Sequence, residues 1–215
     1  MIKEEIVKRI LSSIILIPTV LFFIIKGSFL FNFFIFICFL ITTYEWLKLS
    51  KNNLFKFFGT IFIVISFYTI FKIRNEFDRD YFHLLLVAII CASTDIGGYL
   101  FGNIFKGPKL TKISPKKTYS GVIGSFLLSL IFTNLFLEFS SNVQNFEFTK
   151  EMFLFILLVS FVSQLGDLII SYFKRKSKMK DTGTIIPGHG GILDRIDGII
   201  FALPFSYVLF LNFNF

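Results

Sequence analysis

The chain has 215 residues, of which 54% are hydrophobic and 17% are charged, and its formal net charge is +8. Soluble domains carry about 25% charged residues, so the composition argues against a large soluble core and predicts an all-α, polytopic integral membrane protein. On a soluble protein, a charge of +8 would suggest nucleic acid as a partner. Here the basic residues follow the loops between apolar runs, so we expect no nucleic-acid partner. Cys38 and Cys91 both lie inside apolar runs, which argues against a disulfide framework.

Seven apolar runs approach the length of a membrane span. In chain order they are residues 10–25, 28–43, 57–71, 81–101, 120–139, 152–173 and 199–213. We therefore predict about seven transmembrane helices. With the N-terminus in the cytoplasm, 17 of the 22 lysines and arginines fall in cytoplasmic segments, as the positive-inside rule requires. The loops at residues 102–119 and 174–198 then lie on the cytoplasmic face, and the expected location is a bacterial plasma membrane.

Two aspartates lie inside apolar runs, Asp95 in the fourth and Asp167 in the sixth. Charge is costly near hydrocarbon, so each is a candidate functional group near the cytoplasmic end of its run. The alternative is a carboxylate at a helix end that reaches water or pairs with a nearby lysine. Two glycines after Asp95, Gly97 and Gly98, are better explained by close helix packing than by ligand binding.

The loop between the fourth and fifth runs is strongly basic. Lys106, Lys109 and Lys112 either set the topology and touch anionic lipid headgroups or take part in binding. The run 114–118, Ser-Pro-Lys-Lys-Thr, is more specific, because a proline turn holds Lys116 and Lys117 side by side before the Thr118 hydroxyl. This arrangement predicts a grip on a triphosphate.

Residues 171–198 gather many ionisable groups between two apolar runs. Glycines flank His189 closely, which predicts a tight turn whose backbone amides can approach an anion. Asp194 and Asp197 are three residues apart and share one face of a helix. Carboxylates beside phosphate-binding cations indicate Mg²⁺, although Asp197 could instead pair with Arg195 or cap the last helix. The candidates in this stretch are Lys174, Arg175, Lys180, Asp181, Gly188, His189, Gly190, Gly191, Asp194, Arg195 and Asp197.

Residues 171–197 resemble the signature of the phosphatidate cytidylyltransferases, the CDP-diacylglycerol synthases. The pattern is S-x-x-K-R, four residues, K-D, then P-G-H-G-G-x-x-D-R-x-D. Two upstream pieces are also similar to the family: D-x-x-G-Y-x-x-G from Asp95, and S-P-K-K-T from Ser114, followed by Gly121. The chain departs from the family at Ser120 and Ile170, where many members carry a glutamate.

The resemblance implies the reaction CTP + phosphatidate → CDP-diacylglycerol + pyrophosphate, with Mg²⁺ as cofactor. Asp167 and Asp194 would be the leading metal ligands, with Asp95 and Asp197 as further candidates. The phosphates would be held by Lys116, Lys117, Lys174, Arg175 and Arg195, and the turn at His189 would help close the nucleotide site. Residues 1–80 would be anchor helices, residues 81–215 the catalytic domain, and the assembly a homodimer.

Three other hypotheses follow from the same residues. A related enzyme could use CTP with a polyprenol or ether-lipid acceptor. A transporter or scramblase would also use intramembrane aspartates and glycine-broken helices, but the polar groups gather at one face and no inverted repeat is visible. A CDP-alcohol phosphotransferase is disfavoured because its D-G-x-x-A-R run is absent.

Overall fold

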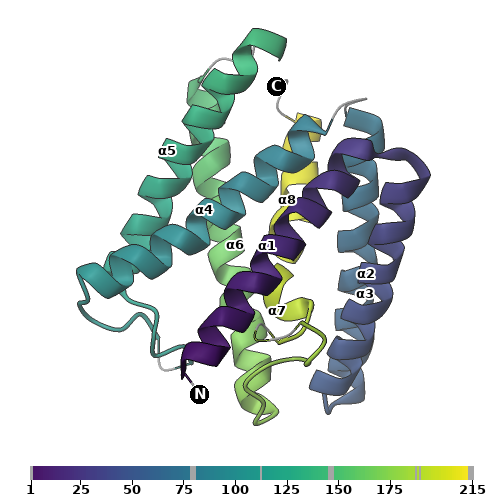
Figure 1. The fold of residues 1–215 in the computed structure, drawn as a ribbon, viewed down its shortest axis with the longest axis vertical. Helices are drawn as coiled ribbons and strands as arrows, with labels where there is room; N and C mark the ends of the chain where they lie inside the picture. Colours follow the sequence, from purple (N-terminus) through teal and green to yellow (C-terminus); the bar gives the residue numbers. More distant parts are fainter. Residues whose placement is uncertain are drawn as a thin grey trace. The chain divides into compact units, whose positions relative to one another are not determined.

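The computed structural model describes residues 2–77, 81–111, 113–144, 148–186, 188 and 190–212, and the regular elements among them are helical. They are α1 (Ile2–Lys26), α2 (Ser28–Leu49), α3 (Asn53–Lys72), the π-helical turn η1 (Ile73–Phe77), α4 (Phe82–Ile104), α5 (Tyr119–Gln144), α6 (Lys150–Lys176), α7 (Leu193–Ile196) and α8 (Ile199–Asn212) (Figure 1). The predicted all-α class is therefore confirmed. The described residues of the seven predicted apolar runs fall in α1 to α6 and α8, apart from Tyr81, which precedes α4.

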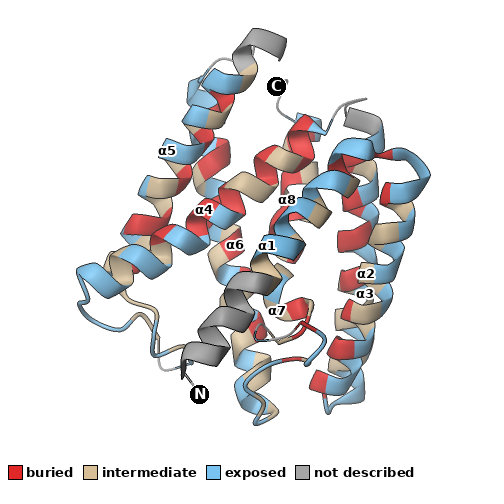
Figure 2. Cartoon of the chain, in the orientation of Figure 1, coloured by how far each residue is buried: buried red, intermediate tan, exposed pale blue. Residues whose placement is uncertain are grey.

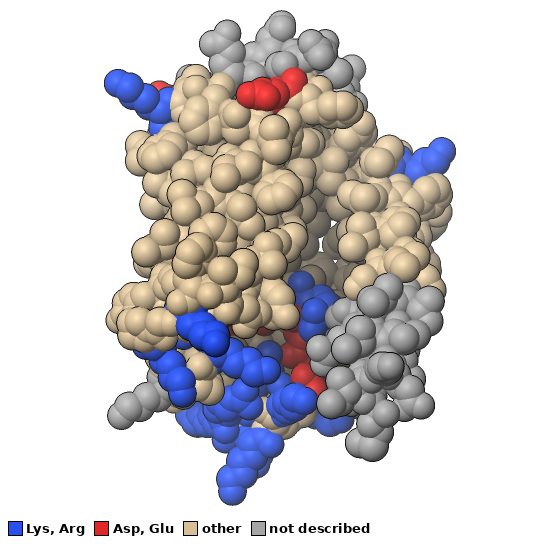
Figure 3. Space-filling view, turned by 60° about the vertical axis from the view of Figure 1, so that its left-hand side comes forward, with Lys and Arg blue, Asp and Glu red and all other residues tan. Residues whose placement is uncertain are grey.

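Five helices are long and apolar enough to cross a membrane: α2, α3 with the start of η1, α4, α5 and α6. The described apolar part of α1, Ser12–Lys26, and α8 are shorter. Large apolar side chains cover the outer helix faces; Phe29 and Phe139 are 77% and 83% exposed. In Figure 2 such exposed positions run along the helices, and in Figure 3 charged side chains are nearly absent between the helix ends. A surface of this kind suits lipid rather than water.

The chain divides into two compact units. Unit 1 comprises Met1–Phe82 and Phe173–Asp197, and unit 2 comprises His83–Tyr172 and Gly198–Phe215. Helix α6 runs through both, ending in unit 1. Most of the signature stretch thus groups with the first three helices. The functional division into anchor helices, residues 1–80, and a catalytic domain, residues 81–215, stays a prediction.

In unit 2, glycines let α4 and α5 pack closely, as predicted for Gly97 and Gly98. A Cβ atom on Gly98 would lie 2.9 Å from Ser125 Oγ, and one on Gly121 would lie 2.8 Å from the Gly98 carbonyl oxygen. Buried hydroxyls add polar contacts between helices, because the Thr94 hydroxyl donates to Ser160 Oγ at 2.8 Å. Small residues and hydroxyls at such interfaces are the usual means of packing helices in a membrane.

In unit 1, the turn between α2 and α3 holds the end of α6. The ring of Phe173 packs edge-on against Trp46 and Phe55, with centroids 4.9 and 5.4 Å away. Lys176 Nζ lies 4.5 Å from the centre of the Phe55 ring, within the range of a cation–π contact. The Ser177 hydroxyl donates to the Leu49 carbonyl oxygen at 2.5 Å. These contacts fix the point where the signature stretch leaves the helix.

Candidate active site

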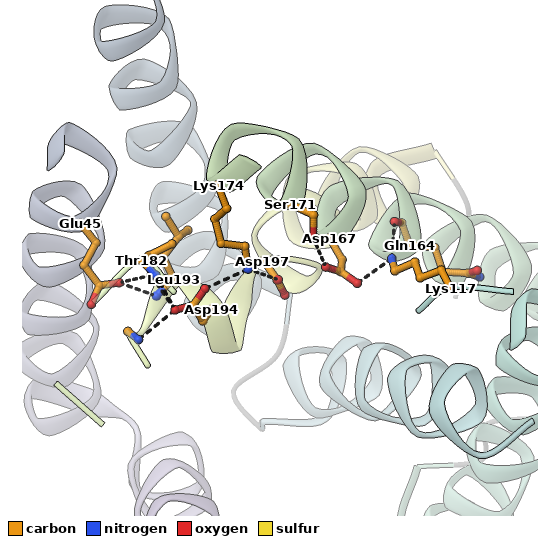
Figure 4. Close-up of polar contacts among 11 residues, drawn as sticks. Glu45, Lys117, Gln164, Asp167, Ser171, Lys174, Thr182, Leu193, Asp194 and Asp197 are labelled. Carbon is orange, nitrogen blue, oxygen red and sulfur yellow. Dashed lines mark hydrogen bonds and ion pairs between the residues drawn. The ribbon is translucent and has the colours of Figure 1, made fainter. Parts of the chain in front are cut away.

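The signature stretch folds around the carboxylate of Asp194 in α7. Its Oδ1 accepts a hydrogen bond from Lys174 Nζ at 2.9 Å. Its Oδ2 accepts from Thr182 N at 2.7 Å, Thr182 Oγ1 at 3.0 Å and Gly191 N at 3.0 Å (Figure 4). The Asp194 side chain is only 3% exposed, and that of Lys174 is 13% exposed. Asp197 Oδ2 lies 4.0 Å from the same Lys174 Nζ.

The surroundings of Asp194 keep it ionised. Burial alone would raise its pKa, but the Gly191 amide, the Lys174 ammonium and the Thr182 amide together hold the pKa below its usual value. A carboxylate that accepts several backbone amides and one ammonium is stable in its charged form even when shielded from water. The chain therefore carries a fixed negative charge at the start of α7, which orients Lys174.

The predicted tight turn is present where the residues are described. Ile186 and Gly190 exchange backbone hydrogen bonds of 2.9 and 3.2 Å. Gly188 and Gly190 have φ angles of +75° and +88°, which residues other than glycine rarely adopt. Pro187 and His189 lie outside the described residues. The turn and the pocket of backbone amides around Asp194 belong to one continuous loop, residues 177–192, which we call the signature loop.

In unit 2, a second lysine–aspartate pair joins the basic loop to α6. Lys117 Nζ lies 2.6 Å from Asp167 Oδ2, and Ser171 Oγ donates to Asp167 Oδ1 at 3.2 Å. Both side chains of the pair are about a quarter exposed, 25% for Lys117 and 27% for Asp167. Lys117 also reaches the Gln164 carbonyl oxygen at 3.4 Å (Figure 4). The fold of unit 2 thus brings together two predicted site residues. The contact agrees with the alternative in which Asp167 pairs with a nearby lysine.

The start of α5 explains the hydroxyls beside this pair. The Gly121 amide donates to Thr118 Oγ1 at 3.1 Å, so Thr118 caps the helix. Thr118 and Ser120 are joined through their hydroxyls at 2.9 Å, and Ser120 Oγ donates to the Lys106 carbonyl oxygen. Ser120 stands at the position where the resemblance leads us to expect a glutamate. In this chain its hydroxyl joins the start of α5 to Lys106 in the basic loop.

Known proteins resemble this chain over most of its length. The cytidylyltransferase family matches residues 53–213. A phosphatidate cytidylyltransferase of Rickettsia felis is 35% identical over 213 residues, covering 96% of this chain and 93% of the relative. The chain belongs to the cytidylyltransferase family. Phosphatidate cytidylyltransferases of Haemophilus influenzae and Bacillus subtilis are 39% and 34% identical, covering 75% and 73% of this chain and 59% and 57% of the relatives.

Membership of the cytidylyltransferase family confirms the resemblance seen in the signature.

The remaining predicted site residues of the described chain lie mostly at the surface. Lys116, Arg175, Lys180, Asp181, Gly188, Arg195 and Asp95 are exposed. Within unit 1, Arg175 and Lys180 expose their cationic side chains to solvent, whereas Lys174 is paired with Asp194. Within unit 1 the signature stretch therefore has a buried centre at Asp194 and a cationic rim of Arg175, Lys180 and Arg195.

The family implies Mg²⁺, and the donors can be compared with what that ion requires. Mg²⁺ takes carboxylate oxygens and keeps several waters or substrate phosphates. Asp167 and Asp197 suit it by chemistry, because both side chains are partly exposed, 27% and 14%. Asp194 would have to exchange one of its four donors for an ion. Among the described residues, no three His, Cys, Asp or Glu side chains are grouped closely enough to form a complete cage.

One residue of the site was missed by the sequence analysis. Glu45 in α2 accepts hydrogen bonds from Ile192 N at 3.1 Å and Leu193 N at 2.8 Å, and its side chain is buried. The one available signal was that Glu45 is the one acidic residue of its apolar helix, near the end predicted to be cytoplasmic, but it lies just beyond the predicted run 28–43. The search for carboxylates inside apolar runs, which selected Asp95 and Asp167, therefore passed over Glu45.

Proposed function

We propose that this chain transfers the cytidylyl group of CTP to phosphatidate, forming CDP-diacylglycerol and pyrophosphate for phospholipid biosynthesis. The observation that carries the proposal is the signature stretch, whose described residues fold around the Lys174–Asp194 pair in a member of the cytidylyltransferase family. Relatives that cover almost the whole chain are named phosphatidate cytidylyltransferases.

The reaction requires charge neutralisation and alignment more than proton transfer. An oxygen of the phosphatidate phosphate forms a bond to the α-phosphorus of CTP, and the bond from that phosphorus to the β-bridging oxygen breaks. Pyrophosphate leaves with the electron pair. A phosphate monoester has a second pKa of about 6, so the attacking oxygen is already largely ionised at neutral pH. No general base is needed, and His189 is not assigned that role.

The chain's own residues would supply the alignment. Arg175, Lys180 and Arg195 on the rim bind phosphate oxygens, as does Lys116 in the basic loop. Lys174 is held in one position by Asp194 and meets charge that develops in the transition state. Mg²⁺, when bound, would supply further neutralisation of the phosphates, and Asp167 in unit 2 and Asp197 in unit 1 are each a candidate ligand for it. The backbone hydrogen bonds between Ile186 and Gly190 hold the turn of the signature loop closed.

The membrane arrangement belongs to the same proposal. We propose seven spans, with the N-terminus and the site on the cytoplasmic side of a bacterial plasma membrane, where CTP is available. The excess of lysine and arginine in the predicted cytoplasmic segments supports this orientation. A cysteine introduced in the loop 102–119 should react with an impermeant thiol reagent only after the membrane is opened. A homodimer stays a prediction.

The function is tested with purified protein in detergent, phosphatidate, Mg²⁺ and CTP labelled in the cytosine. We expect label in the lipid extract, lost when Mg²⁺ is chelated. An ether-linked phosphatidate and a polyprenyl phosphate, supplied in parallel, identify the acceptor. If label enters only the polyprenol fraction, the acceptor is the polyprenyl phosphate and not phosphatidate. If a folded sample puts no label into any lipid, the proposal is refuted.

A further inference from the structure

Glu45 is a buried carboxylate in an electrostatically unfavourable place. It lies in the last turns of α2, where the negative end of the helix dipole opposes an acidic side chain. It is only 1% exposed, so water does not compensate for its charge. Both costs indicate that Glu45 has a role that depends on its partners rather than on its own helix.

All its described hydrogen-bond partners lie in the signature stretch. Oε1 accepts from Ile192 N at 3.1 Å, and Oε2 accepts from Leu193 N at 2.8 Å. The Thr182 hydroxyl lies 3.1 Å from Oε2. These partners are 137–148 residues away in the chain. Glu45 therefore supplies the acceptors that the start of α7 lacks, since Ile192 offers no capping side chain.

Thr182 connects Glu45 to the centre of the site. Its hydroxyl lies 3.1 Å from Glu45 Oε2 and 3.0 Å from Asp194 Oδ2, and Asp194 in turn holds Lys174. The four side chains form a continuous series from α2 to α6 (Figure 4). A shift of Glu45 would move the hydroxyl and both amides, and would reach Lys174 through Asp194.

Two glycines of the signature loop leave room for this carboxylate. A Cβ atom on Gly183 would lie 2.5 Å from Glu45 Oε1, and a Cβ atom on Gly191 would also collide with both Glu45 oxygens. Neither glycine has a positive φ angle, so space rather than backbone conformation explains them. The loop is thus shaped to close over Glu45.

We propose that Glu45 is a positioning residue of the cytidylyl transfer site, fixing the signature loop and α7 so that Asp194 and Lys174 keep their geometry. The inference rests on the proposed function and extends it to the N-terminal helices, which sequence analysis had assigned only to anchoring. Glu45 acts through Thr182 and the two amides, and it contacts no reacting atom.

The test compares Glu45→Gln and Glu45→Ala with Thr42→Val as a matched control. Thr42 is fully buried in the same helix, and its hydroxyl has no hydrogen-bond partner. We expect kcat per folded enzyme to fall about tenfold for Glu45→Gln and about a hundredfold for Glu45→Ala, with KM for CTP within about threefold. Thr42→Val should stay within about twofold. Unchanged kcat per folded molecule, a loss confined to folded yield, or a change confined to KM would each overturn the positioning role.

Gly183→Ala provides a second variant that keeps Glu45. Its new methyl group meets Glu45 Oε1, so we expect about a tenfold loss of kcat alone and less than about a twofold further loss in the Glu45→Ala background. If the losses of kcat from Gly183→Ala and Glu45→Ala were fully additive, the two residues would not act through a shared contact. The cycle uses Glu45→Ala because Glu45→Gln keeps the size of the side chain and would still meet the new methyl group.

A readout that needs no turnover separates this inference from the proposed function. Exposed Lys178 and Lys180 make the signature loop a substrate for trypsin. Glu45→Gln should be cleaved there about tenfold faster than wild type or Thr42→Val. If the wild type transfers no cytidylyl group to any lipid, the proposed function fails, and faster cleavage still supports the loop-fixing contact. Equal cleavage overturns it.

Discussion

Two lysine–aspartate pairs, one in each unit, have similar chemistry and different surroundings. Lys174 and Asp194 in unit 1 are 2.9 Å apart with side chains 13% and 3% exposed. Lys117 and Asp167 in unit 2 are 2.6 Å apart with side chains 25% and 27% exposed. Asp194 accepts three further hydrogen bonds from its own loop, whereas Asp167 accepts one from Ser171. The first pair is part of the fold of the signature loop, and the second is open to a ligand.

The difference shows that two residues with the same predicted role can act in different ways. A buried carboxylate surrounded by amides organises its loop, and its loss leaves donors and a cation without a partner. An exposed carboxylate contributes little to stability and can exchange its lysine for an ion or a phosphate. Substitutions at the two aspartates should therefore separate activity from structure.

Asp194→Ala should have the largest effect. It removes the acceptor for Lys174 and for the Thr182 and Gly191 amides, so cytidylyl transfer should fall by about a thousandfold or more. The signature loop should also be cut faster by trypsin, while the other helices keep their thermal stability. The measurement is turnover and cleavage rate on the same preparation. Near-normal turnover would remove Asp194 from the site.

Asp167→Asn should reduce transfer by about a hundredfold without loosening the loop, because the exposed pair adds little stability. The asparagine keeps the size of the side chain and can still accept from Ser171. Trypsin cleavage and the thermal midpoint should match the wild type. Ser171→Ala is the control, expected to stay within about threefold. If Asp167→Asn destabilised the protein as Asp194→Ala does, the contrast between the pairs would be lost.

Lys117→Met should raise KM for CTP about tenfold, since it removes a cation that the open pair can release to phosphate. Lys109→Met is the matched control in the same loop, because Lys109 is exposed and we place it outside the phosphate grip. Its KM should change less than about twofold. Equal increases for both variants would indicate that the loop acts only through its total charge.

The smallest expected effect is the response of the signature loop to pH. The pKa of Asp194 is lowered below its usual 3.8, so the stabilisation from its ionised form is fully present above that value and is lost as pH falls below it. Hydrogen exchange of residues 178–194, corrected for intrinsic rates, should thus show constant protection from pH 5.5 to 8. Protection that drops within this range would mean that another group holds the loop.

The sequence was sufficient for the helices, because a span of hydrocarbon sets the length and composition of each apolar run. It also identified Lys174, Asp194, Lys117 and Asp167, each from a charge beside apolar sequence or from the signature. It did not reveal Glu45, whose described partners include backbone amides about 150 residues away. Nor could it separate Asp194 from Asp167, since burial depends on how the loop closes and not on residue type.

The most direct measurement of the central claim is the fate of the three phosphates of CTP. Purified protein is incubated with phosphatidate and Mg²⁺, once with CTP labelled at the α-phosphorus and once with CTP labelled at the γ-phosphorus. We expect the α-label to enter the lipid phase at the same rate as the cytosine label, and the γ-label to stay in water as pyrophosphate. Label from the γ-phosphorus in lipid, or α-label that never leaves the aqueous phase, would contradict cytidylyl transfer by this protein.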